Sequence, residues 1–428
     1  MQIFADLHIH SRFSRATSKD ITIQQLEKWA KIKGIDLLGT GDFTHPLWLK
    51  ELKENLTEDG SGFLKTKSGF TFALQTEISL IYSQANKGRR IHLVVLAPSF
   101  SIVDQINDWL SKKGRLDYDG RPIFNISCPE FVEKLKAISK DVEIIPAHAW
   151  TPWFGVFGSK TGFDSLEECF QDQTKHISAI ETGLSSDPPM NWRLSKLDRI
   201  NLVSFSDAHS FWPWRLGREA TIFDIQPTYK ELINAIRTGN GLIGTIEVDP
   251  SYGKYHFDGH RACNVRLAPK ESTKIKNICP VCKKPLTIGV LHRVEELADR
   301  PEQFIPENAK KFFRIIPLSE LIAHYNKTAI NRKSTWDTYF KFIRAFGTEL
   351  NALLKASFEA LCQVTGKENE ELASIIVKNR EGKIPIQPGF DGVYGYPVFD
   401  QKKSKEKENL SLITTAKTEQ KDLKEFFG

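Results

Sequence analysis

The sequence predicts an α/β protein in which residues 1–247 form a parallel sheet or barrel, followed by a small cysteine-containing segment and a helical region. Over the first 247 residues, short apolar runs typical of buried strands alternate with segments of helical spacing. Histidines and carboxylates stand in or just after several of these runs, where parallel folds carry their active sites. Three cysteines then fall within residues 263–282, where the composition changes.

Repeated strand-then-helix units indicate the parallel arrangement. The helices predicted between the strands include one with apolar residues at Ile23, Leu26 and Ala30, and another over Glu130–Ile138. The predicted strands are Ile3–Ala5, Ile35–Leu38, Phe70–Leu74, His92–Leu96, Val142–Ile145, Ile177–Ile180 and Leu202–Phe205.

The rear of the chain divides into three parts. Residues 248–300 are richer in Gly, Pro, Lys and Cys, residues 301–400 are mainly helical in pattern, and residues 401–428 begin with a polar Lys/Glu-rich stretch expected to be a flexible tether. An ordered loop is expected at Pro385–Phe399. The helical patterns are Ala309–Phe313, Leu318–Tyr325, Trp336–Phe346 and Leu350–Leu361.

Composition describes a globular protein that is expected to be cytoplasmic. Of the 428 residues, 40% are hydrophobic and 26% charged, without a run of 18 apolar residues or the pattern of a signal peptide. Residues 251–428 carry 30 Lys+Arg against 22 Asp+Glu, whereas residues 1–250 carry 29 against 31. A near-neutral front with a basic rear suits a catalytic domain joined to a polyanion-binding region, although lysine-rich faces also serve solubility alone.

Two histidine motifs bracket the front region. Asp6-Leu7-His8-Ile9-His10 follows the first apolar run, and Asp207-Ala208-His209 follows a late one. Glu77, His92 and His148 occur in or after other runs. Imidazole and carboxylate are the usual ligands of zinc, iron and manganese, and the pair of histidines in H-x-H lies on one side of an extended chain. The pattern predicts a site for several divalent cations.

This motif set resembles the PHP (polymerase and histidinol phosphatase) superfamily, from H-x-H after the first strand to D-x-H after a late one. The resemblance implies a distorted (β/α)7 barrel with two or three cations (zinc, or manganese or magnesium) and phosphoester hydrolysis. His45 stands two residues later than the family's second motif places its histidine, so either His45 or Asp20 is expected at the third cation. The implied ligands are His8, His10, His45, Glu77, His92, His148, Asp207 and His209, all but His45 and His92 being assigned to catalysis, with Glu77 as the bridging carboxylate.

A second metal site is predicted behind the barrel. His260-x2-Cys263 and Cys279-x2-Cys282 have the spacing of a four-ligand structural zinc site and resemble a zinc ribbon. His256 or His292 are alternatives to His260. A redox role for the C-x-x-C pair is disfavoured, because it does not begin a helix in a βαβ unit.

The last residues contain a peptide motif. Gln420, Leu423, Phe426 and Phe427 match the PCNA-interacting peptide at all four defining positions. Two exposed phenylalanines on a charged tether are unfavourable for solubility without a partner. The resemblance implies binding to a sliding clamp.

Taken together, these parts resemble the endonuclease Q family, DNA-repair enzymes known from archaea. The resemblance implies cutting of damaged DNA 5′ to hypoxanthine, uracil, xanthine or an abasic site. Residues expected to contact the lesion are Trp150, Trp153, Phe154 and Arg193. Two rival functions stay open: a small-molecule phosphatase of the histidinol-phosphate type, and a non-catalytic DNA-binding accessory protein.

Overall fold

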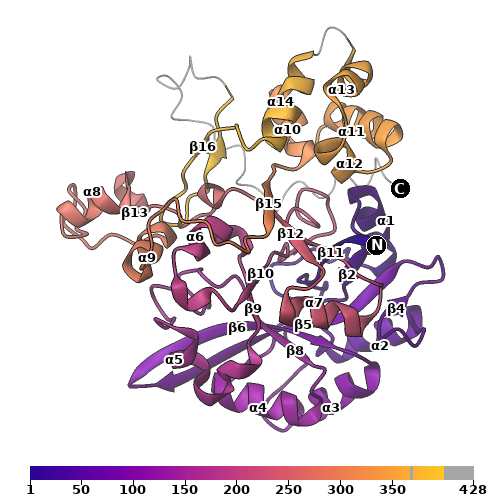
Figure 1. The fold of residues 1–428 in the computed structure, drawn as a ribbon, viewed down its shortest axis with the longest axis vertical. Helices are drawn as coiled ribbons and strands as arrows, with labels where there is room; N and C mark the ends of the chain where they lie inside the picture. Colours follow the sequence, from indigo (N-terminus) through magenta and orange to yellow (C-terminus); the bar gives the residue numbers. More distant parts are fainter. Residues whose placement is uncertain (367–369, 400–428) are drawn as a thin grey trace.

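A mixed eleven-stranded sheet forms the centre of the molecule in the computed structural model, which describes residues 1–366 and 370–399. The main path of strands runs in the order β15-β12-β11-β1-β2-β5-β4-β3 (Figure 1). Strand β1 (Gln2–Asp6) pairs parallel with β2 (Leu37–Gly39) and antiparallel with β11 (Ala220–Asp224). The α/β class is therefore confirmed.

A long hairpin interrupts the predicted strand–helix alternation. Strands β5 (Thr71–Gln84) and β6 (Lys87–Ala97) pair antiparallel over eleven residue pairs. The connecting residues Ala85 and Asn86 both have positive φ, as a two-residue hairpin turn requires. Separate parallel units were expected for these two runs, so the regular repetition is not seen in this part of the sheet. A further two-stranded parallel sheet joins β9 (Ala179–Glu181) to β10 (Asn201–Val203).

The main sheet has further strands beside those already named. The main sheet also contains β3 (Thr57–Glu58), β4 (Leu64–Lys65), β7 (Ile123–Phe124), β8 (Glu143–Pro146), β12 (Leu242–Glu247) and β15 (Lys311–Arg314). Helices around the front region are α1 (Ile23–Lys33), α2 (Pro46–Asn55), α3 (Phe100–Ser111), α4 (Cys128–Ile138), α5 (Leu166–Phe170), α6 (Pro188–Trp192) and α7 (Tyr229–Thr238). No helix formed by residues 1–366 and 370–399 is long and apolar enough to cross a membrane.

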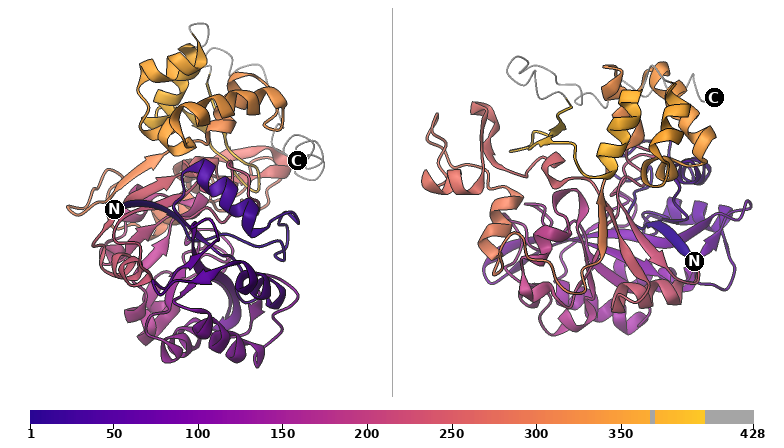
Figure 2. Two further views of the ribbon diagram at one scale, coloured as in Figure 1. Left: turned by 90° about the vertical axis from the view of Figure 1, so that its right-hand side faces the viewer. Right: turned by 45° about the horizontal axis from the view of Figure 1, so that its top comes forward.

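The cysteine-containing segment, which follows β12 and precedes β15 in the chain, protrudes from the side of the molecule (Figures 1 and 2). It contains the hairpin β13 (Asp258–His260) and β14 (Val265–Leu267), then α8 (Pro269–Lys274) and α9 (Val290–Leu297). The chain then returns to the main sheet, because β15 pairs parallel with β12. This contradicts the helix predicted over Ala309–Phe313. Residues Lys311–Arg314, which include two consecutive phenylalanines and lie between prolines 306 and 317, form an edge strand instead.

The C-terminal helices gather at one end of the molecule, above the sheet in both figures. Trp336 of α11 packs against Trp29 of α1, with ring centroids 5.7 Å apart, and both rings contact Trp212. This aromatic cluster joins the end of the chain to the front region. The helices are α10 (Leu318–Tyr325), α11 (Lys333–Phe346), α12 (Glu349–Leu354), α13 (Phe358–Thr365) and α14 (Glu370–Arg380), followed by the small hairpin β16 (Ile386–Gln387) and β17 (Tyr396–Pro397).

Candidate metal centre

The predicted ligands converge from five strands or strand ends. His8 and His10 follow β1, His148 follows β8, and Asp207 and His209 follow β10, whereas Glu77 and His92 project from within the β5–β6 hairpin. Two of these residues, His148 and Asp207, have left-handed backbone with φ of 30° and 47°. Non-glycine residues held in that region cluster at functional sites.

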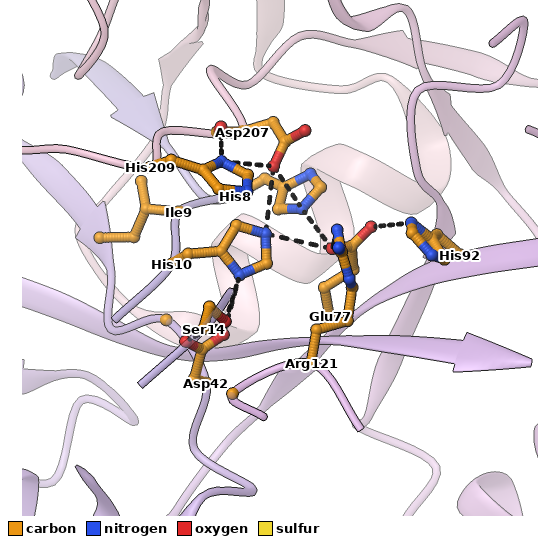
Figure 3. Close-up of polar contacts among 12 residues, drawn as sticks. His8, Ile9, His10, Ser14, Asp42, Glu77, His92, Arg121, Asp207 and His209 are labelled. Atoms are coloured by element: carbon orange, nitrogen blue, oxygen red, sulfur yellow. Dashed lines mark hydrogen bonds and ion pairs between the residues drawn. The ribbon is translucent and has the colours of Figure 1, made fainter. Parts of the chain in front are cut away.

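The first ligand group combines His8, His10, Glu77 and Asp207 (Figure 3). Nε2 of His10 lies 3.1 Å from both Oε2 of Glu77 and Oδ1 of Asp207. Nε2 of His8 lies 3.6 Å from the same two oxygens. Both Nε2 atoms and Oδ1 of Asp207 are buried without a hydrogen bond to any described residue. Two imidazole nitrogens and two carboxylate oxygens aimed at one point fit a divalent cation.

The second ligand group uses the other oxygen of Glu77. Oε1 of Glu77 lies 2.7 Å from Nδ1 of His92 and 3.1 Å from Nε2 of His148. The two histidine nitrogens are 3.3 Å apart. Glu77, which is fully buried, thus presents one oxygen to each group, as a carboxylate bridging two cations would.

Two buried carboxylates orient the histidines from behind. Glu181 lies 2.9 Å from Nδ1 of His8 and accepts the backbone N–H of His148 at 2.6 Å. Asp42 lies 3.0 Å from Nδ1 of His10. Such partners fix the ring and leave Nε2 for the metal. The ends of β1, β2, β8 and β9 are tied together at the centre by these bonds.

The electrostatics favour the ligand forms of Glu77, Asp207 and His92. Burial raises the pKa of the Glu77 carboxyl, but His92, Arg121 and His8 outweigh it and hold that pKa well below its usual range. His8 and His209 likewise hold the pKa of Asp207 low against the effect of burial. Burial lowers the pKa of His92 to about 4. At neutral pH these carboxyls are ionised and this imidazole is neutral, which are the ligand forms. For His8, His10 and His148, burial lowers the pKa but neighbouring carboxylates outweigh it and raise the pKa, so a cation bound there would displace a proton.

Two residues proposed for a third cation lie outside both ligand groups. His45 is the N-cap residue of α2, and its ring stacks on Phe13 with centroids 4.2 Å apart. His45 therefore contributes no atom to either ligand group. Asp20 is also absent from both groups, while His209 adjoins the first one, its ring 4.5 Å from that of His10.

The cysteine-containing segment holds a separate cluster. His260, Cys263, Cys279 and Cys282 each place one ligand atom within 4.8 Å of the others. His292 instead pairs with Asp258, and His256 stacks on Phe257, so neither joins this group. Burial raises the pKa of the Cys279 thiol, but backbone N–H groups of residues 281 and 282 outweigh it and lower that pKa to about 6. The thiolate is the form that binds metal.

Comparison with known proteins places this geometry in a family. The crystal structure of PfuEndoQ, a lesion-specific endonuclease from Pyrococcus furiosus, is 31% identical to the chain, with a TM-score of 0.84 over 95% of this chain and 98% of that one. The chain belongs to the endonuclease Q family. A structure of endonuclease Q with a 27-mer duplex substrate carrying an abasic lesion at the active site is likewise 31% identical, with a TM-score of 0.83 over 94% of this chain and 98% of that one.

Two uncharacterized relatives extend the endonuclease Q comparison. YqxK of Bacillus subtilis is 30% identical over 92% of this chain and 98% of its own length. MJ0043 of Methanocaldococcus jannaschii is 32% identical, but the match spans 60% of this chain and only 32% of that protein. Residues 317–383 match the family described as the MJ0043 C-terminal domain, which corresponds to helices α10–α14.

The residues expected to contact a lesion occupy different environments in this endonuclease Q fold. Trp150 is fully buried and donates its indole N–H to Asn191 at 2.8 Å. Arg193 is also buried, in a bidentate ion pair with Glu295. Core packing and ion pairing already engage these two side chains, and lesion contact by them stays a prediction.

Of the two remaining expected residues, Phe154 lies beside the centre. Phe154 is half-buried, has a φ of 67°, and packs on the ring of ligand His92 with centroids 4.2 Å apart. Trp153, also half-buried, packs edge-on against Tyr255. Of the two, Phe154 is the one whose ring packs on a ligand of the centre, and contact of either side chain with a lesion stays a prediction.

Sequence reasoning missed the supporting side chains of the site. Glu181 directly follows the predicted strand Ile177–Ile180 and ends β9, so its place at a strand end was a usable signal. Asp42 follows β2 in the same way. Arg121, whose Nη1 lies 2.9 Å from Oε2 of Glu77, comes from a segment without any motif and offered no such signal.

Proposed function

We propose that this member of the endonuclease Q family hydrolyses DNA 5′ to a damaged nucleotide: hypoxanthine, uracil, xanthine or an abasic site. The observation that carries the proposal is the pair of ligand groups sharing Glu77, one on each oxygen. Full-length likeness to a lesion-specific endonuclease supports DNA as the substrate. The excess of positive charge over residues 251–428 supports contacts with phosphates.

The chemistry requires positive charge beside both the attacking and the leaving oxygen, which stand on opposite sides of the phosphorus in an in-line displacement. Divalent cations in the two groups would lower the pKa of water and hold the attacking and leaving oxygens in line. Glu77 and Asp207 would neutralise part of that charge, while Glu181 and Asp42 keep the histidine rings in place. Water adds to phosphorus and the P–O3′ bond breaks, which leaves a 3′-hydroxyl and a 5′-phosphate.

Recognition of a lesion follows from the burial of the metal ligands. A base in duplex DNA must leave the stack to expose its sugar-phosphate to buried ligands, at a cost of about a few kcal/mol that is smaller for damaged pairs. Stacking of the displaced nucleotide on Trp153 or Phe154 would offset part of that cost, since base–aromatic stacking contributes about 1–3 kcal/mol.

The other parts of the chain support this role. We assign a structural zinc to His260, Cys263, Cys279 and Cys282, within a zinc-ribbon-like unit at 248–300, between a distorted (β/α)7 PHP domain at 1–247 and a helical domain at 301–400. The PCNA-interacting motif at Gln420, Leu423, Phe426 and Phe427 lies outside the described residues. We propose that it binds a sliding clamp.

The deciding experiment compares three substrates under one set of conditions. A labelled duplex with one deoxyinosine should be nicked once, 5′ to the lesion, and the new end should be extended by a polymerase because it carries a 3′-hydroxyl. The undamaged duplex should stay intact, and chelation followed by readdition of zinc or manganese should abolish and restore nicking. Hydrolysis of a small phosphomonoester without nicking would favour the phosphatase instead.

A further inference from the structure

One arginine reaches into the metal centre. Nη1 of Arg121 lies 2.9 Å from Oε2 of Glu77, the oxygen that also faces His8 and His10 (Figure 3). Within the described part of the chain, Arg121 is the one Lys or Arg that pairs with a member of either ligand group. Its side chain is 26% exposed, whereas Glu77 has no exposure at all. The guanidinium thus connects the buried bridging carboxylate to solvent.

The segment that carries Arg121 is held tightly against the centre. The preceding Gly120 has no room for a side chain, because an added Cβ would collide with Asp42 and Ser14, which both bond to His10. The carboxylate of Asp119 accepts the backbone N–H of Arg121 at 3.2 Å. This segment is therefore fixed to the same network that orients His10.

Further backbone bonds fix the segment from the other side. Thr44 donates its hydroxyl to the carbonyl of Gly120 at 3.3 Å. The backbone N–H of Ser79 donates to the carbonyl of Pro122 at 3.1 Å. Because Ser79 is two residues from Glu77 on the same strand, the strand that supplies the bridging carboxylate also positions the arginine.

A phosphate that approaches the exposed edge of the ligand groups needs a hydrogen-bond donor there. Asp207 is the exposed member of the first ligand group, and His209 lies next to that group. Each has a 32% exposed side chain. The carboxylate of Asp207 repels a phosphate. The histidine nitrogens of the ligand groups are the atoms that would bind the cations, so they do not serve as donors to the phosphate. Only Nη1 of Arg121 has a hydrogen-bond partner among the described residues, so Nε and Nη2 keep their donor capacity.

We infer that Arg121 is a catalytic residue that binds a non-bridging oxygen of the scissile phosphate and stabilises the additional negative charge of the transition state. The inference rests on the proposed DNA hydrolysis and deepens it. A guanidinium presents paired N–H groups in a fixed fork that matches two phosphate oxygens, and its positive charge persists at any pH the protein tolerates. Its contact with Glu77 orients it before the substrate arrives, as electrostatic stabilisation requires.

The alternative is that Arg121 only neutralises Glu77 and helps to hold the ligand groups together. In that case its replacement would lower metal content or stability, and the reactivity of the phosphate would not change. Metal content, DNA affinity and a substrate substitution therefore separate the two roles.

The test uses the full chain with R121Q and R121K, and R115Q as a matched control. Arg115 is an exposed arginine of the same segment and pairs with Asp117. With deoxyinosine duplex, single-turnover nicking by R121Q should fall by about 100- to 1,000-fold, the typical effect of losing one preorganised donor. R121K should retain part of the rate, and R115Q should nick nearly as well as the unaltered chain. All variants should keep the same metal content and thermal midpoint.

The decisive comparison uses substrates in which sulfur replaces one non-bridging oxygen of the scissile phosphate. For one of the two diastereomers, the rate penalty of sulfur should be large in the unaltered chain and much smaller in R121Q, because the contact is already missing there. Equal penalties in both enzymes, loss of metal from R121Q, or full activity of R121Q would each overturn the inference. Absence of nicking by the unaltered chain would instead refute the proposed function.

Discussion

At the scale of single residues, the centre depends on which imidazole nitrogen is left free. Glu181 and Asp42 bind Nδ1 of His8 and His10, so both rings direct Nε2 toward Glu77 and Asp207. Neither carboxylate occurs in a local motif with the histidine it orients, since 173 and 32 residues separate the partners. The sequence therefore indicated the ligands through their strand positions, while the pairing of each histidine with its orienting carboxylate became visible only in the folded chain.

The first prediction concerns Asp207, whose φ of 47° is a conformation that Asn tolerates well. Asp207→Asn keeps the shape of the side chain but removes a carboxylate from the first ligand group. Because loss of an outer partner alone typically costs about 10- to 100-fold, loss of this ligand should lower single-turnover nicking by about 100-fold or more. Affinity for uncut lesion DNA, measured by fluorescence anisotropy, should change little. Full activity at matched metal would contradict the assignment.

At the scale of elements, the sequence predicted most helices and many strands but not all their partners. The predicted helices over Leu318–Tyr325 and Trp336–Phe346 are confirmed as α10 and α11. The single helix expected at Leu350–Leu361 is two, because Ser357 accepts the N–H of Ala360 and begins a new helix. Short apolar runs do not distinguish strand from helix by periodicity, which explains the error at β15.

The second prediction concerns the cysteine-containing segment. Cys279→Ser removes a buried thiolate ligand and should release one metal ion per chain, as measured by elemental analysis, with loss of protection from proteolysis between β12 and β15. Ligands in the main centre should keep their metal. The matched control is Cys362→Ser, which changes a half-buried cysteine of α13 outside the cluster and should alter neither property. Unchanged metal content in Cys279→Ser would refute the structural site.

At the scale of the whole molecule, a buried ion pair joins the front region to the C-terminal helices. Nζ of Lys33 in α1 lies 2.7 Å from Oε1 of Glu349 in α12, and Tyr339 donates to the other oxygen at 2.7 Å. Glu349 also accepts the backbone N–H of Leu318 at the start of α10. One carboxylate therefore fixes three helices of the rear region to one helix of the front.

The third prediction follows from that burial. Glu349→Ala leaves the ammonium of Lys33 buried without its carboxylate, which should reduce stability by about 3–5 kcal/mol. Replacing both partners with apolar residues, Lys33→Met with Glu349→Leu, should be less harmful than the single change. Glu381→Ala breaks an exposed pair with Lys383 and should cost about 1 kcal/mol or less. Thermal unfolding midpoints of the four proteins test this order, and equal midpoints for both single variants would contradict it.

The last prediction concerns cooperation between the centre and the clamp motif. Changing Phe426 and Phe427 to Ala removes two aromatic anchors, which supply most of the binding energy of a short peptide. Nicking by the free enzyme should be nearly unchanged, whereas stimulation by a sliding clamp should be lost. Direct binding through phosphates weakens steeply with salt, and clamp tethering raises the effective enzyme concentration on DNA, so the stimulation should be greatest at high salt. Nicking rates measured against salt, with and without clamp, test this for both chains. Equal stimulation of the altered chain would show that the clamp is recognised elsewhere.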